Sequence, residues 1–302
     1  MNDRGRAQGD GRASGSGGPV GVRTSRRAVL ALPLAAAACG PFSGCGSGGA
    51  AGGAQVASPT PEPRELVVLA ASSLTDAFGE MAESFPRGPG LNGTKVRLSF
   101  GASSQLRVQL EQGAPADVFE SADAIQMEAA VRGGLMKGAP SVFARNRLVV
   151  IVPRENRAAI ATLADLARPG LKVVSTAKEV PIGAYTLEAL GKLGADAQYG
   201  AGYAARVLGN VVSEEANVRQ IVTKVQLGEA DAGFVYASDV TTRVAGDVRT
   251  IEIPERFQPA AEHLIGVTRG AKAPALAQRF VEYVLDPAGR SILQKHGFVP
   301  LR

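Results

Sequence analysis

Hydrophobic residues in the part of the chain after residue 64 follow two recurring patterns. The segment 66–71, LVVLAA, is a continuous apolar run, which is typical of a strand buried on both faces. The next apolar residues are spaced for one face of a helix, namely Leu74, Ala77, Phe78, Met81 and Phe85. This strand and helix together predict the first βα unit of a larger domain.

The same alternation continues to the end of the chain. Apolar runs predict strands at 66–71, 95–100, 118–119, 148–152, 171–175, 232–236, 250–253 and 263–267. Helical spacing predicts helices at 74–85, 104–112, 124–132, 184–193, 218–227 and 274–285. Repeated strand–helix alternation favours an α/β fold with mostly parallel sheets flanked by helices, in which ligands bind beyond the carboxyl ends of the strands.

The first 63 residues have a different composition. Residues 1–22 are rich in Gly, Arg and Ser, have no apolar periodicity and are predicted to be disordered. Arg26 and Arg27 then precede an apolar run that ends near Ala38, which is typical of an export signal and too short for a stable transmembrane helix. The arginine pair resembles a twin-arginine signal, although an ordinary secretory signal would also fit.

Small residues precede both cysteines of the chain, as in a bacterial lipobox. Either Cys39 or Cys45 could therefore be lipidated, and we favour Cys45 because Ser43 and Gly44 precede it and a Gly- and Ser-rich stretch follows. A signal peptidase site with incidental cysteines is the alternative. Residues 46–63 then form a predicted flexible linker, so the chain is expected to be extracytoplasmic and anchored to the cell membrane.

The net charge of +5 arises mainly in this leader. Residues 1–45 contain six arginines and two aspartates, and removing them from the totals of 33 and 28 leaves 27 basic and 26 acidic residues. The folded part lacks the basic excess expected of a nucleic-acid-binding protein. Beyond residue 45 there is no cysteine, and the two histidines lie far apart, so a metal site has almost no candidate ligands. We expect His296 to face the last carbonyl groups of a helix.

Two predicted strand-to-helix junctions are rich in hydroxyl groups. One is 71–76, ASSLTD, and the other is 100–104, FGASS. A helix N-terminus has unpaired N–H groups and a partial positive charge, so it can bind an anion. Serine at such a position is also a common N-cap, so each junction alone has two interpretations.

Several further segments complete a resemblance to a known family. The segments AASSLTDAF, SFGASSQL, GAPADVF at 113–119, VPIGAY, NVR, GFVYASD and HGFVP match, in order and spacing, the periplasmic molybdate-binding proteins of ABC importers. The resemblance covers nearly all of residues 65–302. It implies the two-lobed type II periplasmic binding protein fold, with the ligand in the cleft. The lobes would comprise residues 65–147 plus 259–302, and residues 148–258.

The resemblance also implies a binding site for a tetrahedral oxyanion. Ser73 and Ser103 would each donate through the hydroxyl and amide groups, Ile182 and Val218 through their backbone amides, and Tyr236 through its hydroxyl. Many family members have alanine at the position of Ile182, and an amide contact tolerates that change. Without the family match, a tyrosine at the end of an apolar strand, such as Tyr236, is more often a core residue with its hydroxyl in solvent.

Neutral donors suit molybdate and tungstate, which are fully deprotonated at neutral pH and accept hydrogen bonds only. Sulfate is also free of protons and stays an alternative, whereas monohydrogen phosphate would need an acceptor. We expect structural roles for Asp76, Asp117 and Asp239, and a solvated position on a helix face for Arg219.

The sequence thus predicts a monomeric solute-binding protein that delivers molybdate or tungstate to an ABC permease. It lacks a recognisable nucleophile–base set, paired carboxylates or a phosphate loop, so neither catalysis nor a cofactor is expected. An effector-sensing domain of a transcription regulator is a further alternative. It would require a DNA-binding segment where the leader stands.

Overall fold

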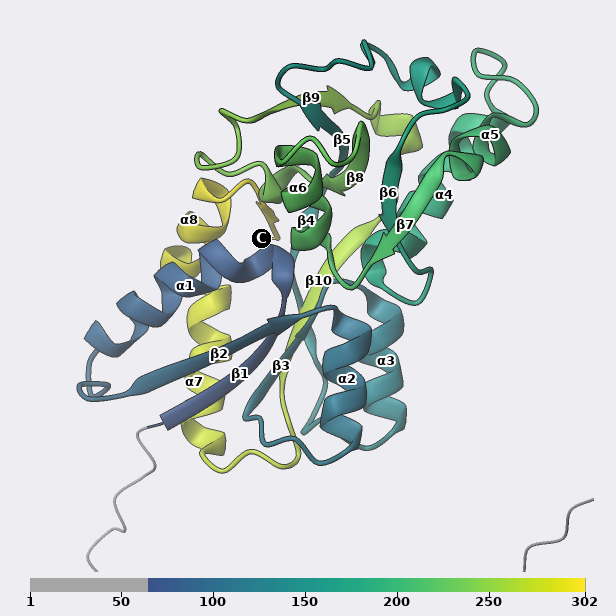
Figure 1. Cartoon of the computed structure of the whole chain (residues 1–302). Coiled ribbons are helices and arrows are strands. Elements are labelled where there is room, and N and C mark those ends of the chain that lie inside the picture. The colour runs from purple at the N-terminus through teal and green to yellow at the C-terminus, as the bar shows by residue number, and fades with distance from the viewer. Residues whose placement is uncertain (1–64, 302) are drawn as a thin grey trace, which may run out of the picture. The chain divides into compact units, whose positions relative to one another are not determined.

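Two sheets flanked by helices make up the described part of the protein, which is residues 65–301 of the computed structural model (Figure 1). The strands are β1 (Glu65–Ala71), β2 (Lys95–Gly101), β3 (Val118–Ser121), β4 (Ser141–Asn146), β5 (Leu148–Pro153), β6 (Val173–Thr176), β7 (Val211–Glu215), β8 (Ala232–Tyr236), β9 (Val248–Glu252), β10 (Ala261–Val267) and β11 (Val299–Pro300). The first sheet has the order β11-β4-β10-β3-β1-β2, and the second has the order β7-β6-β8-β5-β9.

The α-helices follow the strands closely in sequence. They are α1 (Thr75–Ser84), α2 (Ser103–Glu111), α3 (Ala124–Arg132), α4 (Pro181–Ala195), α5 (Tyr203–Gly209), α6 (Val218–Gln226), α7 (Pro274–Leu285) and α8 (Pro287–Lys295). Short 3-10 helices are η1 (Ser72–Leu74), η2 (Phe85–Arg87), η3 (Leu163–Ala167), η4 (Ala237–Asp239) and η5 (Glu255–Phe257). Among the described residues, no helix is long and apolar enough to span a membrane.

Each sheet is mixed rather than mostly parallel. Strands β1, β2 and β3 pair in parallel, as do β6, β7 and β8, because a helix connects successive members of each group. In the first sheet, β10 pairs antiparallel with β3 and β4, and β11 pairs antiparallel with β4. In the second sheet, β5 lies between β8 and the edge strand β9 and pairs antiparallel with both. The alternation of strands and helices predicted all of the parallel strands except β7, and it predicted β5, β9 and β10 but missed β4 and β11 and did not show that these strands pair antiparallel.

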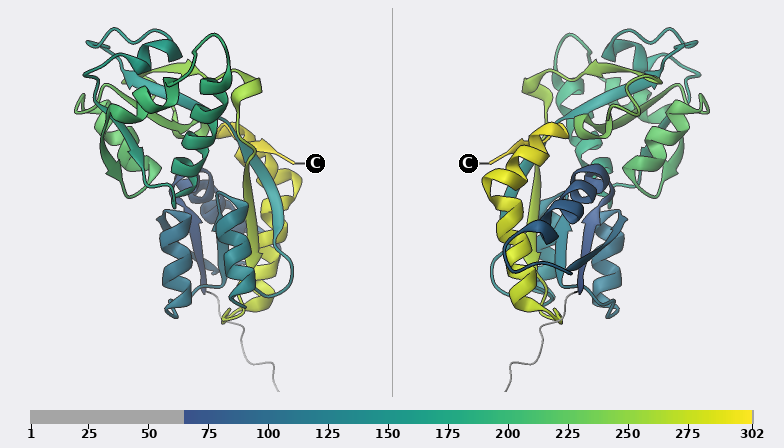
Figure 2. Two further views of the ribbon diagram at one scale, coloured as in Figure 1. Left: turned by 90° about the vertical axis from the view of Figure 1, so that its right-hand side faces the viewer. Right: turned by 90° about the vertical axis from the view of Figure 1, so that its left-hand side faces the viewer.

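The chain passes between the sheets twice. Strand β4 ends at Asn146 in the first sheet and β5 begins at Leu148 in the second, and the chain returns between η5 and β10. Figure 2 shows the two sheets with their helices as separate halves joined by these crossing segments. We therefore propose residues 65–147 plus 259–302 as the first lobe and residues 148–258 as the second.

Separate apolar clusters support the two lobes. In the first lobe, aromatic rings pack between the sheet and helices α1 and α7, with the Phe78 and Phe280 centroids 5.8 Å apart. The other face of the sheet packs Phe119 against Leu106 and Met127 of helices α2 and α3. The second lobe has its own cluster around β5, β6 and β8. Burial of these side chains holds each sheet and its flanking helices as one unit, which fixes the strand ends that carry the site.

The C-terminal end of helix α8 corrects one expectation. His296 caps the helix and Gly297 follows with a φ of 81°, as a helix end requires. The imidazole does not face the last carbonyl groups, however, because its Nε2 lies 2.8 Å from a carboxylate oxygen of Glu80 on helix α1. This contact joins the first and last helices of the first lobe.

Two glycines let helices approach the second sheet closely. A Cβ atom at Gly233 in β8 would lie 2.4 Å from the Cγ2 atom of Ile221, so glycine is required for α6 to pack directly on the strand. A Cβ atom at Gly183, in the first turn of α4, would lie 2.2 Å from the carbonyl oxygen of Ala177. The N-terminus of α4 can therefore lie against the end of β6 only with glycine at this position.

We expect Gly183→Ala to destabilise the protein by about 1–3 kcal/mol, because the backbone of helix α4 must shift to relieve the overlap. The matched control is Gly191→Ala in the same helix, where a Cβ atom would meet nothing within 4 Å. That change should be neutral or stabilising by up to about 1 kcal/mol, because alanine favours helix over glycine. Urea unfolding of both variants checks the prediction, and equal stability of the two would contradict it.

Candidate functional site

A small cavity lies where helix N-termini of both lobes meet. It has a volume of about 20 Å³, and all five residues of the predicted site line it. Those residues are at most 4% exposed. The walls are formed by Ala71, Ser72, Ser73, Gly101, Ala102, Ser103, Ala122, Val180, Pro181, Ile182, Asn217, Val218 and Tyr236. None of these residues is charged, so the polar groups that a ligand would meet are hydroxyl, side-chain amide and backbone groups.

The two serines do not cap their helices. Helix η1, which contains Ser73, and helix α2, which begins at Ser103, both lack a side-chain hydrogen bond at the N-cap. The Oγ atom of Ser73 is buried and has no hydrogen-bond partner among the described residues. The Oγ atom of Ser103 accepts a hydrogen bond from the backbone N–H of Ala122 at 3.0 Å. Its own proton therefore stays available for another acceptor.

The second lobe contributes two helix N-termini to the same cavity. Helix α4 begins at Pro181, which has no N–H, and its N-cap residue Val180 makes no side-chain hydrogen bond. The amide of Ile182 is thus a first-turn donor that neither the helix itself nor a side-chain cap satisfies in the described part of the chain. Helix α6 is capped by Asn217, which accepts from the amides of Arg219 and Gln220. Asn217 does not accept from the amide of Val218, the first residue of that helix, so this amide stays available as a donor.

Tyr236, at the end of strand β8, completes the donor set. Its hydroxyl is buried and has no hydrogen-bond partner in residues 65–301, so it does not reach solvent. Burial raises the pKa of Tyr236 well above its usual value, and the neighbouring Tyr185 and Asp123 act in the same direction. The phenol therefore keeps its proton at neutral pH and can donate a hydrogen bond into the cavity.

Behind the cavity wall lies a buried carboxyl–imidazole pair that the sequence analysis did not identify. The Nδ1 atom of His263 lies 2.7 Å from Oε1 of Glu120, and both side chains are fully buried. The second carboxylate oxygen accepts from the amide of Ala71 at 2.7 Å. Ala71 immediately precedes helix η1, so the pair fixes the start of the turn that carries Ser73. Its only signal in the sequence was a charged residue, Glu120, directly after the apolar pair at 118–119.

The aspartates near the motifs have the structural positions that were expected, and two of them, Asp117 and Asp239, hold backbone groups. Asp117 accepts from the amides of Val67, Lys272 and Ala273 at 2.7–3.1 Å, and Asp76 lies in the first turn of α1. Asp239 accepts from the amide of Tyr236 at 3.1 Å. Burial raises the pKa of Asp239 to about 6, and the nearby guanidinium group of Arg219 opposes that rise.

Arg219 differs from the expectation. Its side chain is only 25% exposed and makes ion pairs with Asp76 at 2.7 Å and with Asp239 at 3.3 Å. From its place on helix α6, directly after Val218, the Arg219 side chain reaches the carbonyl oxygen of Ser72 in the first lobe rather than solvent. The sequence could not show this, because Asp76 is 143 residues away.

No group of three or more potential metal ligands occurs among the described residues. Taken together, the serine, amide and tyrosine donors described above place hydrogen-bond donors around the cavity at the ends of five elements, namely η1, α2, α4, α6 and β8. Such an arrangement can surround a small anion that accepts hydrogen bonds on all sides.

Comparison with known proteins shows the family and the fold. Residues 66–299 match a model of bacterial extracellular solute-binding proteins. A molybdate-binding protein of Mycobacterium bovis is 40% identical over 255 residues, covering 84% of this chain and 91% of the relative. Two solved structures share the fold. A periplasmic molybdate-binding protein of Azotobacter vinelandii has a TM-score of 0.67 and 22% identity, covering 78% of this chain and all of its own. The sulfate-binding protein of Mycobacterium tuberculosis has a TM-score of 0.69 and 18% identity, covering 78% of this chain and 87% of its own.

The match to the family model spans nearly the whole described region, and the mycobacterial relative exceeds 30% identity over most of both chains. The chain therefore belongs to the family of bacterial extracellular solute-binding proteins.

Proposed function

We propose that the protein binds molybdate or tungstate outside the cytoplasm and delivers it to an ABC permease, with no catalysis and no cofactor. The observation that carries the proposal is the set of buried, unpaired donors around one uncharged cavity. The hydroxyl groups of Ser73 and Tyr236 have no partner in the described part of the chain, and no side-chain cap accepts from the amides of Ile182 and Val218 at the starts of α4 and α6. The molybdate-binding protein of M. bovis, at 40% identity, supports the same ligand.

The donors favour a fully deprotonated anion. A buried donor without an acceptor costs free energy, and a ligand that offers only acceptors removes that cost at each donor it reaches. Monohydrogen phosphate carries a proton that requires an acceptor, and no Asp or Glu is among the residues lining the cavity. Sulfate offers acceptors only, but its S–O bonds are shorter than Mo–O bonds. Sulfate is therefore the closest competitor, and it would reach fewer of the donors at once.

For the ligand itself, we expect sodium molybdate and sodium tungstate to raise the Tm in a concentration-dependent way. Ligand at 100 times its Kd adds about 2.7 kcal/mol to the free energy of unfolding, which corresponds to a rise of about 5–10 °C for a protein of this size. Thermal scans with molybdate, tungstate, sulfate and phosphate check this. Stabilisation by phosphate or sulfate but by neither metal oxyanion would show that the proposed ligand is wrong.

Each donor should contribute separately to affinity. Ser73→Ala, Ser103→Ala and Tyr236→Phe should each weaken molybdate binding about tenfold or more, because a hydrogen bond to a charged group is worth roughly 1.5–3 kcal/mol. The matched control is Ser104→Ala, one residue further along α2 and outside the cavity lining. Calorimetric titration measures all four affinities.

Stability of the ligand-free protein gives a second readout for the same variants. Ser73→Ala and Tyr236→Phe each remove a buried hydroxyl that has no partner in the described structure, so they should leave the ligand-free protein as stable as the wild type or more stable. A loss of stability with unchanged affinity would instead indicate that these hydroxyls serve the fold.

The lipid anchor is proposed from residues outside the described part of the structure. If Cys45 is the lipidated residue, Cys45→Ala should release the protein from the membrane fraction while Cys39→Ala retains it. Cell fractionation followed by immunoblotting measures this, with globomycin treatment as the control for lipoprotein processing. The reverse pattern would assign the anchor to Cys39, and membrane retention of the double variant would exclude a lipid anchor at either cysteine.

A further inference from the structure

Arg219 connects the two lobes beside the cavity, although it does not line it. It lies on helix α6 of the second lobe, and its Nε atom donates to the backbone carbonyl oxygen of Ser72 at 3.1 Å. Its Nη2 atom lies 2.7 Å from Oδ2 of Asp76 on helix α1 of the first lobe. The two side chains are 25% and 18% exposed, so solvent screens this pair less than a surface pair. Arg243 also approaches Asp76, at 3.5 Å, but it is 87% exposed and contributes little.

The same guanidinium group also contacts its own lobe. Its Nε atom lies 3.3 Å from Oδ1 of Asp239, and the other oxygen of Asp239 accepts from the amide of Tyr236. Arg219 therefore touches three segments that each carry a donor of the proposed site. It follows Val218 directly, it binds the residue before Ser73, and it is linked through Asp239 to Tyr236.

We propose that Arg219 is a positioning residue that acts as a latch between the lobes and sets how long the bound anion is retained. The proposal rests on the function proposed above. The contacts to Ser72 and Asp76 join different lobes, so they can form only when the lobes are closed. A ligand that bridges Ser73 and Val218 also requires closure. The latch and the ligand thus stabilise the same state, and each strengthens the other.

The latch acts through closure rather than through attraction of the anion. Arg219, Asp76 and Asp239 together carry one positive and, when ionised, two negative charges, so the cluster offers an approaching dianion no net positive field. Long-range attraction would raise the association rate and would weaken in salt. A latch that forms after the anion has entered slows dissociation instead, and salt changes that rate much less.

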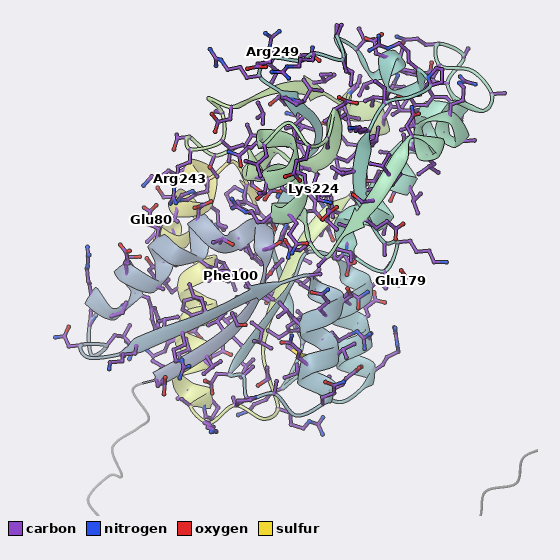
Figure 3. The ribbon with its side chains drawn as sticks, viewed as in Figure 1. Glu80, Phe100, Glu179, Lys224, Arg243 and Arg249 are labelled. Carbon is purple, nitrogen blue, oxygen red and sulfur yellow. The ribbon has the colours of Figure 1, made fainter. Side chains whose placement is uncertain are left out.

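The test compares molybdate association and dissociation rates, measured by stopped-flow, for the full-length wild type, Arg219→Ala and Arg219→Lys. We expect both variants to release molybdate about tenfold faster or more, with association rates within about twofold of the wild type. Lysine keeps the charge but cannot make the forked contacts of a guanidinium group, so it should resemble alanine. The control is Arg249→Ala, an exposed arginine on β9 that Figure 3 shows at the end of the second lobe remote from the first.

Two results would contradict the latch. One is a dissociation rate within twofold of the wild type in Arg219→Ala. The other is an effect confined to the association rate, absent in Arg219→Lys and abolished at high salt, which would show charge attraction. A double-mutant cycle with Asp76→Asn adds a further check, because the combined variant should release molybdate more slowly than the product of the two single effects predicts. Multiplicative effects would show that the two side chains act independently.

Thermal scans of each ligand-free variant verify that it is folded. Small-angle X-ray scattering measures closure of the lobes without ligand, so it separates failure of the latch from failure of the proposed ligand. If wild-type protein does not bind molybdate, the proposed function is wrong and the latch is judged by scattering alone. A larger radius of gyration for Arg219→Ala than for wild type then supports closure by this residue. An equal radius would overturn it.

Discussion

Unpaired N–H groups at helix N-termini are the constraint around which this protein is organised. A side-chain cap can satisfy such donors, as Asp123 and Asp286 do for α3 and α8 and Asn217 does for two amides of α6. Helices α1, α5 and α7 also lack a side-chain cap, but their N-termini do not line the cavity. The three N-termini of η1, α2 and α4, all of which meet the cavity, have no side-chain cap. Buried donors without acceptors oppose folding. Their grouping at one point therefore means that the apolar clusters of both lobes must supply the stability that these ends do not.

Charged side chains support the cavity from outside its wall. The Glu120–His263 pair holds the amide of Ala71, and Asp239 holds the amide of Tyr236. In each case a carboxylate fixes a backbone group next to a donor of the cavity and leaves the donor itself free. There is a physical reason for keeping charged groups out of the wall, because a positively charged side chain there would attract every anion by Coulomb attraction. Oriented neutral donors respond to the positions of acceptor atoms, and hence to the shape and protonation of the ligand.

Much of the fold could be predicted from the sequence, because long apolar runs and helical spacing report burial directly. Helices α3 and α7 and strand β8 begin and end where the pattern placed them. Strand β7 was missed since its sequence, VVSEE, is half exposed at the edge of the second sheet, and β4 was missed because polar residues interrupt it.

The site was more difficult to predict. Periodicity placed Ser73 and Ser103 at helix starts, but only the resemblance suggested that they bind a ligand rather than cap a helix, and only the structure shows that neither caps. The contacts of Arg219 span 143 and 147 residues, and no local pattern can report such distances.

A site built from neutral donors also determines where affinity can be adjusted. No side chain that lines the cavity is charged and the Arg219 cluster has no net positive charge, so differences in affinity are expected mainly in the dissociation rate. The donors themselves define which anion fits, and changing them would alter selectivity together with affinity. A change in the contacts between the lobes can alter affinity without altering selectivity, because these contacts depend on closure and not on which anion is bound. A guanidinium group beside the cavity, balanced by two carboxylates, can therefore lengthen retention while leaving the choice of anion to the cavity wall.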